Sequence, residues 1–169
     1  MTNDVEGLGY DPKKSELIFA CKGSPNLKGH KKYKHSKAYY TYNIETKKFN
    51  EEPKFVLDDD QLIDFVSEKM KGNEISKSKL KKLKKRIKEF SPSAIAKHPK
   101  ENHFCIISSV GKSLVVCDDD GFVLDIVFLN PDIHSQPEGI TFDSDGRIYI
   151  SNEGLSLVAK IYQFDNIKL

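Results

Sequence analysis

The chain has 169 residues, 38% of them hydrophobic, and a formal net charge of +2. This composition suits one globular domain with its own core and argues against a disordered chain. No stretch of about 18 apolar residues is present, which excludes a transmembrane helix. The start MTNDVEGLGY lacks the basic and apolar segments of a signal peptide, so the chain as given is expected to be soluble.

Charge and cysteine content narrow the possible classes of protein. The stretch from Lys77 to Lys88 holds eight basic residues and no acid, so the rest of the chain is net negative. The three cysteines have no zinc-type spacing and cannot all pair internally, which argues against a zinc site and a disulfide framework. We expect Cys21, Cys105 and Cys117 to act as small buried hydrophobic residues.

The first predicted element is a β-hairpin over residues 6–23 (EGLGYDPKKSELIFACKG). An alternating apolar strand ends at Asp11, Pro-Lys-Lys-Ser supplies turn residues, and a second apolar strand runs to Gly23. Two short apolar stretches, 38–43 and 54–57, follow this hairpin. Residues 5–57 are therefore predicted to form a four-stranded unit.

A helical insertion is predicted over residues 59–90, where the strand-like alternation stops. Gly72-Asn73 separates two stripes of apolar residues at helical spacing. The eight basic residues on the polar face would suit nucleic acid or an anionic membrane. A solvated face of a helix packed on the β-structure explains the same pattern, so a nucleic-acid partner is not favoured. The stripes are Leu62, Ile63, Phe65, Val66 and Met70, then Leu80, Leu83, Ile87 and Phe90.

The hairpin pattern returns twice after the insertion. Residues 93–111 (SAIAKHPKENHFCIISSVG) and 138–154 (EGITFDSDGRIYISNEG) align with the first copy and differ in length mainly at the central turn. Apolar stretches follow both copies, at 113–118 and 122–129 after the second and at 158–165 after the third. We therefore predict a four-stranded unit over residues 91–130 and an incomplete, three-stranded unit over residues 136–166.

Three similar units of four, four and three strands indicate a β-propeller. Such a unit cannot cover its own faces and must stack on copies of itself. A β-sandwich would also contain many short strands, but it would not need the same hairpin three times. The predicted fold class is all-β with a helical insertion, in which residues 1–169 form a partial propeller domain of about three blades.

Five groups of short motifs follow one another along nearly the whole chain: EGL and YDP at 6–12, ACKG at 20–23, PSAIA-HP at 92–99, SS-GK-LVV-D-DG at 108–121 and QPEGI-FD-DG-YISNEG at 136–154. In this order they resemble the SdiA-regulated β-propeller family. The resemblance implies a propeller with calcium in its channel and, in its complete form, export to the bacterial periplasm or cell envelope.

The number of blades limits what this chain can form alone. Propellers close with roughly four to eight blades, so about three cannot ring a central channel. Family members carry further blades upstream of this region. We therefore expect a fragment of a longer protein, with completion by a partner or a six-bladed ring of two copies as the alternatives.

Four residues at strand ends are the candidate metal ligands: Glu6, Glu138, Glu153 and Asn152. In a propeller the first strand of each blade lines the channel, and the hairpin returns the second strand to the level where the first began. Crowded carboxylates repel one another, which favours a bound hard cation such as calcium. A solvated strand end explains Glu153 equally well, and Asn152 could simply cap its loop.

The predicted site is asymmetric because the three hairpins differ at these positions. The second copy has Ser93 and Val110 where the third has Glu138 and Glu153. In the first copy, Lys22 stands at the Glu153 position.

Other polar clusters offer weaker chemistry. His98, His103 and His134 fall in predicted turns or loops, where we expect solvated side chains and not metal ligands. The aspartate triplets at 58–60 and 118–120 lack EF-hand spacing, so turn and helix-start roles are expected. No serine lies in a G-x-S-x-G context, and no catalytic residue is predicted.

These observations leave three functional hypotheses. The first is a calcium-binding propeller with an unidentified ligand at its channel and no established catalytic activity. The second is a metal-assisted hydrolase of a phosphoester or lactone at the channel mouth, but the sequence offers no convincing general base for it. The third is an interaction module that uses the helical insertion. Enzymatic activity is therefore left open.

Overall fold

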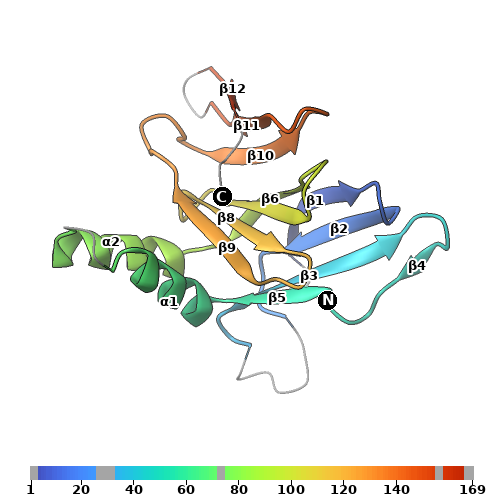
Figure 1. Ribbon diagram of the computed structural model, residues 1–169, viewed down its shortest axis with the longest axis horizontal. Helices are drawn as coiled ribbons and strands as arrows, with labels where there is room; N and C mark the ends of the chain where they lie inside the picture. Colours follow the sequence, from blue (N-terminus) through green and yellow to red (C-terminus); the bar gives the residue numbers. More distant parts are fainter. Residues whose placement is uncertain (1–3, 26–32, 72–74, 155–157, 166–169) are drawn as a thin grey trace.

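Three antiparallel sheets follow one another along the chain (Figure 1). The computed structural model describes residues 4–25, 33–71, 75–154 and 158–165. Each sheet starts with a predicted hairpin and adds its later strands in sequence order. Among the described residues the sheets do not close into a ring, which fits a partial propeller.

The first sheet contains β1 (Val5–Asp11), β2 (Glu16–Cys21), β3 (Ser36–Asn43), β4 (Lys48–Phe49) and β5 (Phe55–Asp58). Both β4 and β5 pair with β3, one at each end of it. The outer strand predicted at 54–57 is therefore β5, and β4 is a second piece of outer strand that the sequence pattern did not predict. The residues between the pieces remain attached to β3, because Asn50 and Lys54 donate backbone hydrogen bonds to the carbonyl oxygens of Thr41 and Tyr39.

The second sheet has four strands and the third has three, as predicted. In the third sheet Gly146 has a φ of 91°, so the Asp145-Gly146 turn signal lies where the chain needs the left-handed region. The strands of the second sheet are β6 (Pro92–Lys97), β7 (His103–Ser108), β8 (Ser113–Asp118) and β9 (Val123–Phe128). Those of the third are β10 (Pro137–Phe142), β11 (Ile148–Asn152) and β12 (Lys160–Phe164).

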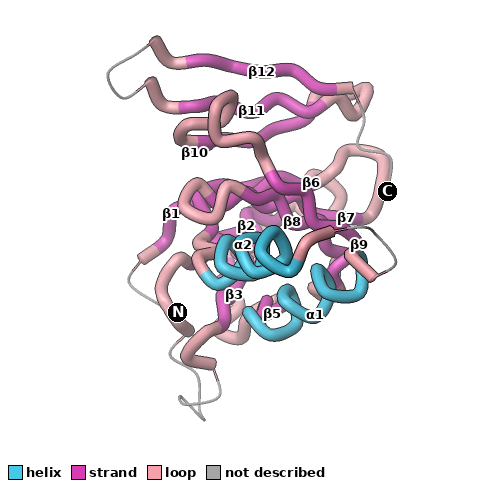
Figure 2. Tube along the Cα trace, turned by 90° about the vertical axis from the view of Figure 1, so that its left-hand side faces the viewer, coloured by secondary structure: helices cyan, strands magenta, loops and turns pink. Residues whose placement is uncertain are grey.

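The predicted insertion forms two helices, α1 (Asp59–Lys69) and α2 (Lys77–Lys88), that lie side by side at the edge of the first two sheets (Figure 2). Asp58 caps α1 by accepting a hydrogen bond from the Asp60 backbone N–H, which confirms a helix-start role for this aspartate triplet. Ser76 caps α2 in the same way. The predicted break at Gly72-Asn73 lies outside the described residues.

The first three strands of the second sheet are buried on both faces, which explains their largely apolar composition. Alternate residues of β7 point into different core clusters. Phe104 and Ile106 face the first sheet and the helices, whereas Cys105 and Ile107 face the third sheet. The three sheets therefore stack as blades, with a core cluster at each of the two interfaces and a third, smaller cluster within the first sheet.

All three cysteines are buried, which confirms their predicted packing role. Burial raises the pKa of the Cys105 thiol to about 12, so this side chain is inert at neutral pH. Within the parts of the chain that the structure describes, no helix is long and apolar enough to cross a membrane.

Candidate functional site

The first strands of the three sheets, β1, β6 and β10, lie next to one another in the order of the chain (Figure 1). Two glycines of β1 permit this close approach. A Cβ atom on Gly9 would lie 2.8 Å from the carbonyl oxygen of Ile95, and one on Gly7 would lie 3.3 Å from the backbone of Ala94. The first strand of each blade is thus the inner strand, as a propeller channel requires.

Each inner hairpin carries a β-bulge at the same position. The register shifts between Val5 and Gly7, between Pro92 and Ala94, and between Pro137 and Gly139. The extra residues are Glu6, Ser93 and Glu138, and a bulged residue is left outside the ladder of backbone pairs. The structure therefore places Glu6 and Glu138 at equivalent points of two blades.

The second strands end opposite these bulges, but one predicted correspondence was wrong. Pro92 pairs with Ser108 and Pro137 pairs with Asn152, so Ser109 and not Val110 corresponds to Glu153. The second hairpin has one extra residue before its terminal glycine, so aligning the hairpins by their terminal glycines shifted this position by one residue. We call the six side chains at this level the start rim: Glu6, Lys22, Ser93, Ser109, Glu138 and Glu153.

Lysines offset the acidic charges of the start rim. Lys22 donates a hydrogen bond from Nζ to Glu6 Oε1 at 2.6 Å, and more than a third of each side chain is exposed. This bond raises the pKa of Lys22, and the charge of Glu138 adds to the effect. Burial lowers the pKa of Lys112, while the same Glu138 acts in the opposite direction. Glu138 therefore lies within electrostatic reach of two lysines.

The three predicted carboxylate ligands are not gathered into one cluster. Among the described residues, the group of three acidic, imidazole or thiol ligands that come within 4.8 Å of one another is His98, Glu101 and His103. Glu6, Glu138 and Glu153 share the start rim without forming such a group.

Asn152 offers an oxygen atom without a partner. The residue is 5% exposed, and its side chain lies on the face of β11 that carries Ile148 and Ile150. Its Nδ2 atom lies 3.3 Å from His134 Nδ1, whereas Oδ1 is buried and makes no hydrogen bond. Buried carbonyl oxygens are normally satisfied, so this atom is available to a ligand or a water molecule.

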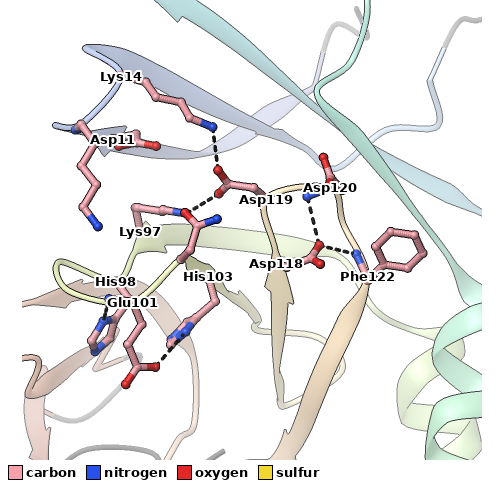
Figure 3. A network of polar contacts seen from close by, with 12 residues as sticks. Asp11, Lys14, Lys97, His98, Glu101, His103, Asp118, Asp119, Asp120 and Phe122 are labelled. Carbon is pink, nitrogen blue, oxygen red and sulfur yellow. Dashed lines mark hydrogen bonds and ion pairs between the residues drawn. The ribbon is translucent and has the colours of Figure 1, made fainter.

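A network of paired charges joins the opposite ends of the first two inner strands to the turn between β8 and β9 (Figure 3). Asp119 accepts hydrogen bonds from Lys14 Nζ, at 2.6 Å, and from Lys97 Nζ. Burial alone would raise the pKa of Asp119, but these two bonds outweigh it and hold the pKa at about 2. The Lys97 ammonium group also lies 4.3 Å from the ring centroid of Phe104. We call Lys14, Lys97 and Asp119 the turn-rim network, and it ties the first sheet to the second.

Comparison with known families identifies the chain. The model of the SdiA-regulated family matches residues 2–158, which is most of the sequence. The chain belongs to the SdiA-regulated family. No curated protein sequence matches it significantly.

Solved structures similar to this SdiA-regulated protein share its fold. A luciferin-regenerating enzyme has a TM-score of 0.54 and 14% identity, over 95% of this chain and 44% of that one. A chain in a nidogen/laminin complex has a TM-score of 0.51 and 12% identity, over 94% of this chain and 43% of that one. The SdiA-regulated chain thus spans less than half the length of either structure. At these identities the likeness concerns the β-propeller fold alone.

Three histidines of this SdiA-regulated protein were expected to be solvated, and that expectation was wrong. His98, His103 and His134 are all buried. His98 Nδ1 accepts hydrogen bonds from the backbone N–H groups of Lys100 and Glu101. Burial lowers the pKa of His98 and favours the neutral ring, whose proton must then sit on Nε2. This hydrogen-bonding pattern leaves His98 no lone pair for a metal and gives it a structural role in the β6–β7 turn.

Sequence reasoning missed the basic partners at both rims. Lys22 was noted only as the residue that replaces a glutamate, although a lysine beside an aligned glutamate is itself a signal for an ion pair. Asp118 has the predicted turn role, since its side chain accepts from the backbone of Asp120 and Phe122. The contacts of Asp119 with Lys14 and Lys97 join separate segments, and no local pattern in the SdiA-regulated sequence indicates them.

Proposed function

We propose that this SdiA-regulated protein binds calcium at the start rim of its channel. Glu6 and Glu138 would supply carboxylate oxygens from the first and third blades. Glu153 and the Oδ1 atom of Asn152 would supply further oxygens from the third blade. Calcium prefers six to eight oxygen ligands, and this donor set contains oxygen alone.

The observation that carries the proposal is the shared bulge. The same irregularity recurs at Glu6 and Glu138, and it takes both residues out of the backbone ladder of an inner strand. A bulge commonly redirects a side chain next to a functional site. The unsatisfied Oδ1 of Asn152 belongs to the residue paired with Pro137, next to Glu138.

When no cation is bound, the Glu6 carboxylate is held in an ion pair with Lys22. Both side chains are partly exposed, and such pairs contribute only about 0–1 kcal/mol. A divalent cation can therefore take the Glu6 carboxylate from Lys22 at little cost. A bound calcium ion would supply charge neutralisation between blades and open positions for an anionic ligand in the channel.

The family resemblance also supports a location for the complete protein. We infer that it acts at the bacterial envelope, as an exported binding protein whose channel ligand is unidentified. Fractionation of cells that express the complete protein tests this location. Recovery of the protein in the cytoplasmic fraction would contradict it.

Thermal unfolding with and without calcium tests the binding proposal. Calcium at about 100 times its dissociation constant should stabilise the full-length protein by about 2.7 kcal/mol, and magnesium should stabilise it less. Glu138→Gln should remove the calcium effect, because it removes a charged ligand while keeping the side-chain volume. The exposed Glu51→Gln is the matched control and should retain the effect. An equal calcium effect in both variants would contradict the proposed site.

A further inference from the structure

Helix α2 is held in one orientation against the blades. Ile87 is fully buried, and Leu80 and Leu83 pack against the same core. Arg86 donates hydrogen bonds to the carbonyl oxygens of Gly111 at 3.0 Å, of Leu129 at 2.8 Å and of Lys112. Its guanidinium carbon also lies 4.9 Å from the ring centroid of Phe128. The helix therefore cannot roll, and its remaining faces point away from the core.

The outward faces of α2 present a line of lysines. Lys77, Lys81, Lys84 and Lys88 follow one another at spacings of four, three and four residues, which places them on one stripe of the helix. At 1.5 Å per residue this stripe is roughly 16 Å long. The same lysines line a groove between α1 and α2, whose wall includes the apolar side chains of Ile63 and Leu80. We call these four residues the lysine stripe.

The lysine stripe lacks acidic partners within the described part of the chain. The ion pair formed by α2 there joins Lys85 to Glu89 at 3.6 Å. Asp60 lines the groove but forms none of the described ion pairs with the stripe. Lysines three and four residues apart repel one another on a helix. The stripe is thus an uncompensated positive surface that a polyanionic partner would stabilise.

We propose that the lysine stripe docks the protein on the surface of an anionic phospholipid bilayer. The exposed cations of α2 are all lysines, and the arginine of the helix is occupied by backbone carbonyl groups. Helix α2 has no aromatic residue. Nucleic-acid grooves typically use arginine forks and aromatic stacking, whereas lysine acts as a point charge toward headgroups.

The surroundings of the stripe fit docking on a membrane without insertion into it. Lysine stems can lie along apolar surface while the ammonium groups reach toward phosphates, and Ile63 and Leu80 provide such a surface. The apolar face of α2 is already used by the core, so it is not free to enter the bilayer. Binding is therefore electrostatic and should weaken steeply as salt rises.

Vesicle co-sedimentation of the full-length chain tests this proposal. The protein should bind vesicles of mixed phosphatidylglycerol and phosphatidylcholine at low salt, and it should be released at high salt. It should not bind pure phosphatidylcholine. Each lysine near an anionic surface contributes about fivefold in affinity, so changing all four stripe lysines to glutamine should weaken binding by roughly 600-fold. Glutamine has nearly the helix propensity of lysine, which preserves α2.

The matched control removes the same charge elsewhere. Changing the exposed Lys34, Lys47, Lys48 and Lys160 to glutamine should lower the affinity by less than about threefold, because these residues lie outside α2. An equal loss in the two variants would overturn the proposal in favour of diffuse charge. The proposal would also be overturned if the protein did not bind anionic vesicles at low salt. Displacement of the vesicles by DNA at equal phosphate concentration would overturn it as well. Circular dichroism of both variants identifies any loss that comes from unfolding.

Discussion

The two rims of the inner strands carry similar numbers of charges but use them differently. At the turn rim, Asp119 bridges Lys14 and the buried Lys97, so every member of that network has a partner. At the start rim, Glu6 has one exposed lysine partner, and the bulged Glu138 has no described hydrogen bond or ion pair, although two lysines lie within electrostatic reach. Close, buried pairs fasten blades together, whereas loosely compensated carboxylates remain available to a ligand. The turn rim is therefore structural, and the start rim is the candidate site.

The largest effect should come from breaking the turn-rim network. Asp119→Asn removes the charge that compensates Lys97, whose side chain is 1% exposed. Leaving such a charge unpaired typically costs about 3–5 kcal/mol. We expect the free energy of unfolding to fall by about 3 kcal/mol in denaturant titration. The neighbouring, exposed Asp120→Asn should change it by less than about 0.5 kcal/mol. Equal effects would mean that the network does not join the blades.

The second-largest loss of stability should come from a substitution at the contact between the inner strands β1 and β6. Gly9→Ala would place a Cβ atom 2.8 Å from the backbone oxygen of Ile95, and backbone cannot rotate away. We expect destabilisation of about 2 kcal/mol, measured by denaturant titration. At Gly139 the added atom would meet the hydroxyl of Ser151, which can change rotamer, so Gly139→Ala should cost less. The reverse order would contradict the close approach of β1 and β6.

The dependence of stability on acidic pH should distinguish the turn-rim network from the start rim. The pKa of Asp119 is about 2 in the folded protein, below the ordinary value of about 3.9 for aspartate. A depressed acid pKa gives stability that is present above pH 4 and is lost as the pH falls toward 2. Across that pH range, the free energy of unfolding should fall more steeply for the wild type than for Asp119→Asn. Parallel pH curves for the two proteins would contradict the assignment.

The smallest effect should come from the start rim. Lys22→Gln removes the ammonium group that competes for Glu6, so calcium affinity should rise by a few fold, in line with the modest strength of an exposed ion pair. Without calcium, the same change should alter stability by less than about 1 kcal/mol. Calorimetric titration measures the affinity change. Weaker calcium binding would show that Lys22 supports the site and does not compete with it.

Periodicity and repetition in the sequence predicted most of the fold. The three hairpins, the later strands of each sheet and the helical insertion were recognisable because each element depends on local alternation or helical spacing. The division of the outer strand into β4 and β5 was not recognisable, because it depends on how residues 50–54 pass along β3. Likewise, the equivalence of Ser109 and Glu153 required the observed register.

The candidate site was predictable in position but not in environment. The repeat placed Glu6 and Glu138 at one level, and the bulges confirm that correspondence. The burial of His98 and the pairing of Asp119 with Lys97 arise from contacts between separate segments. Such contacts have no signature in the spacing of one sequence, so polar turns that looked solvated proved to be buried.

The most direct measurement is a calcium titration by calorimetry on the full-length protein and on the double variant Glu6→Gln/Glu138→Gln. Calcium coordination by the two bulged carboxylates predicts binding to the wild type and a loss of at least about tenfold in affinity in the double variant. Without calcium, the free energy of unfolding of the variant should differ from that of the wild type by less than about 1 kcal/mol, because the ion pair of Glu6 is exposed and neither carboxylate belongs to the turn-rim network. Calcium binding of equal affinity in both proteins, or none in the wild type, would contradict the account.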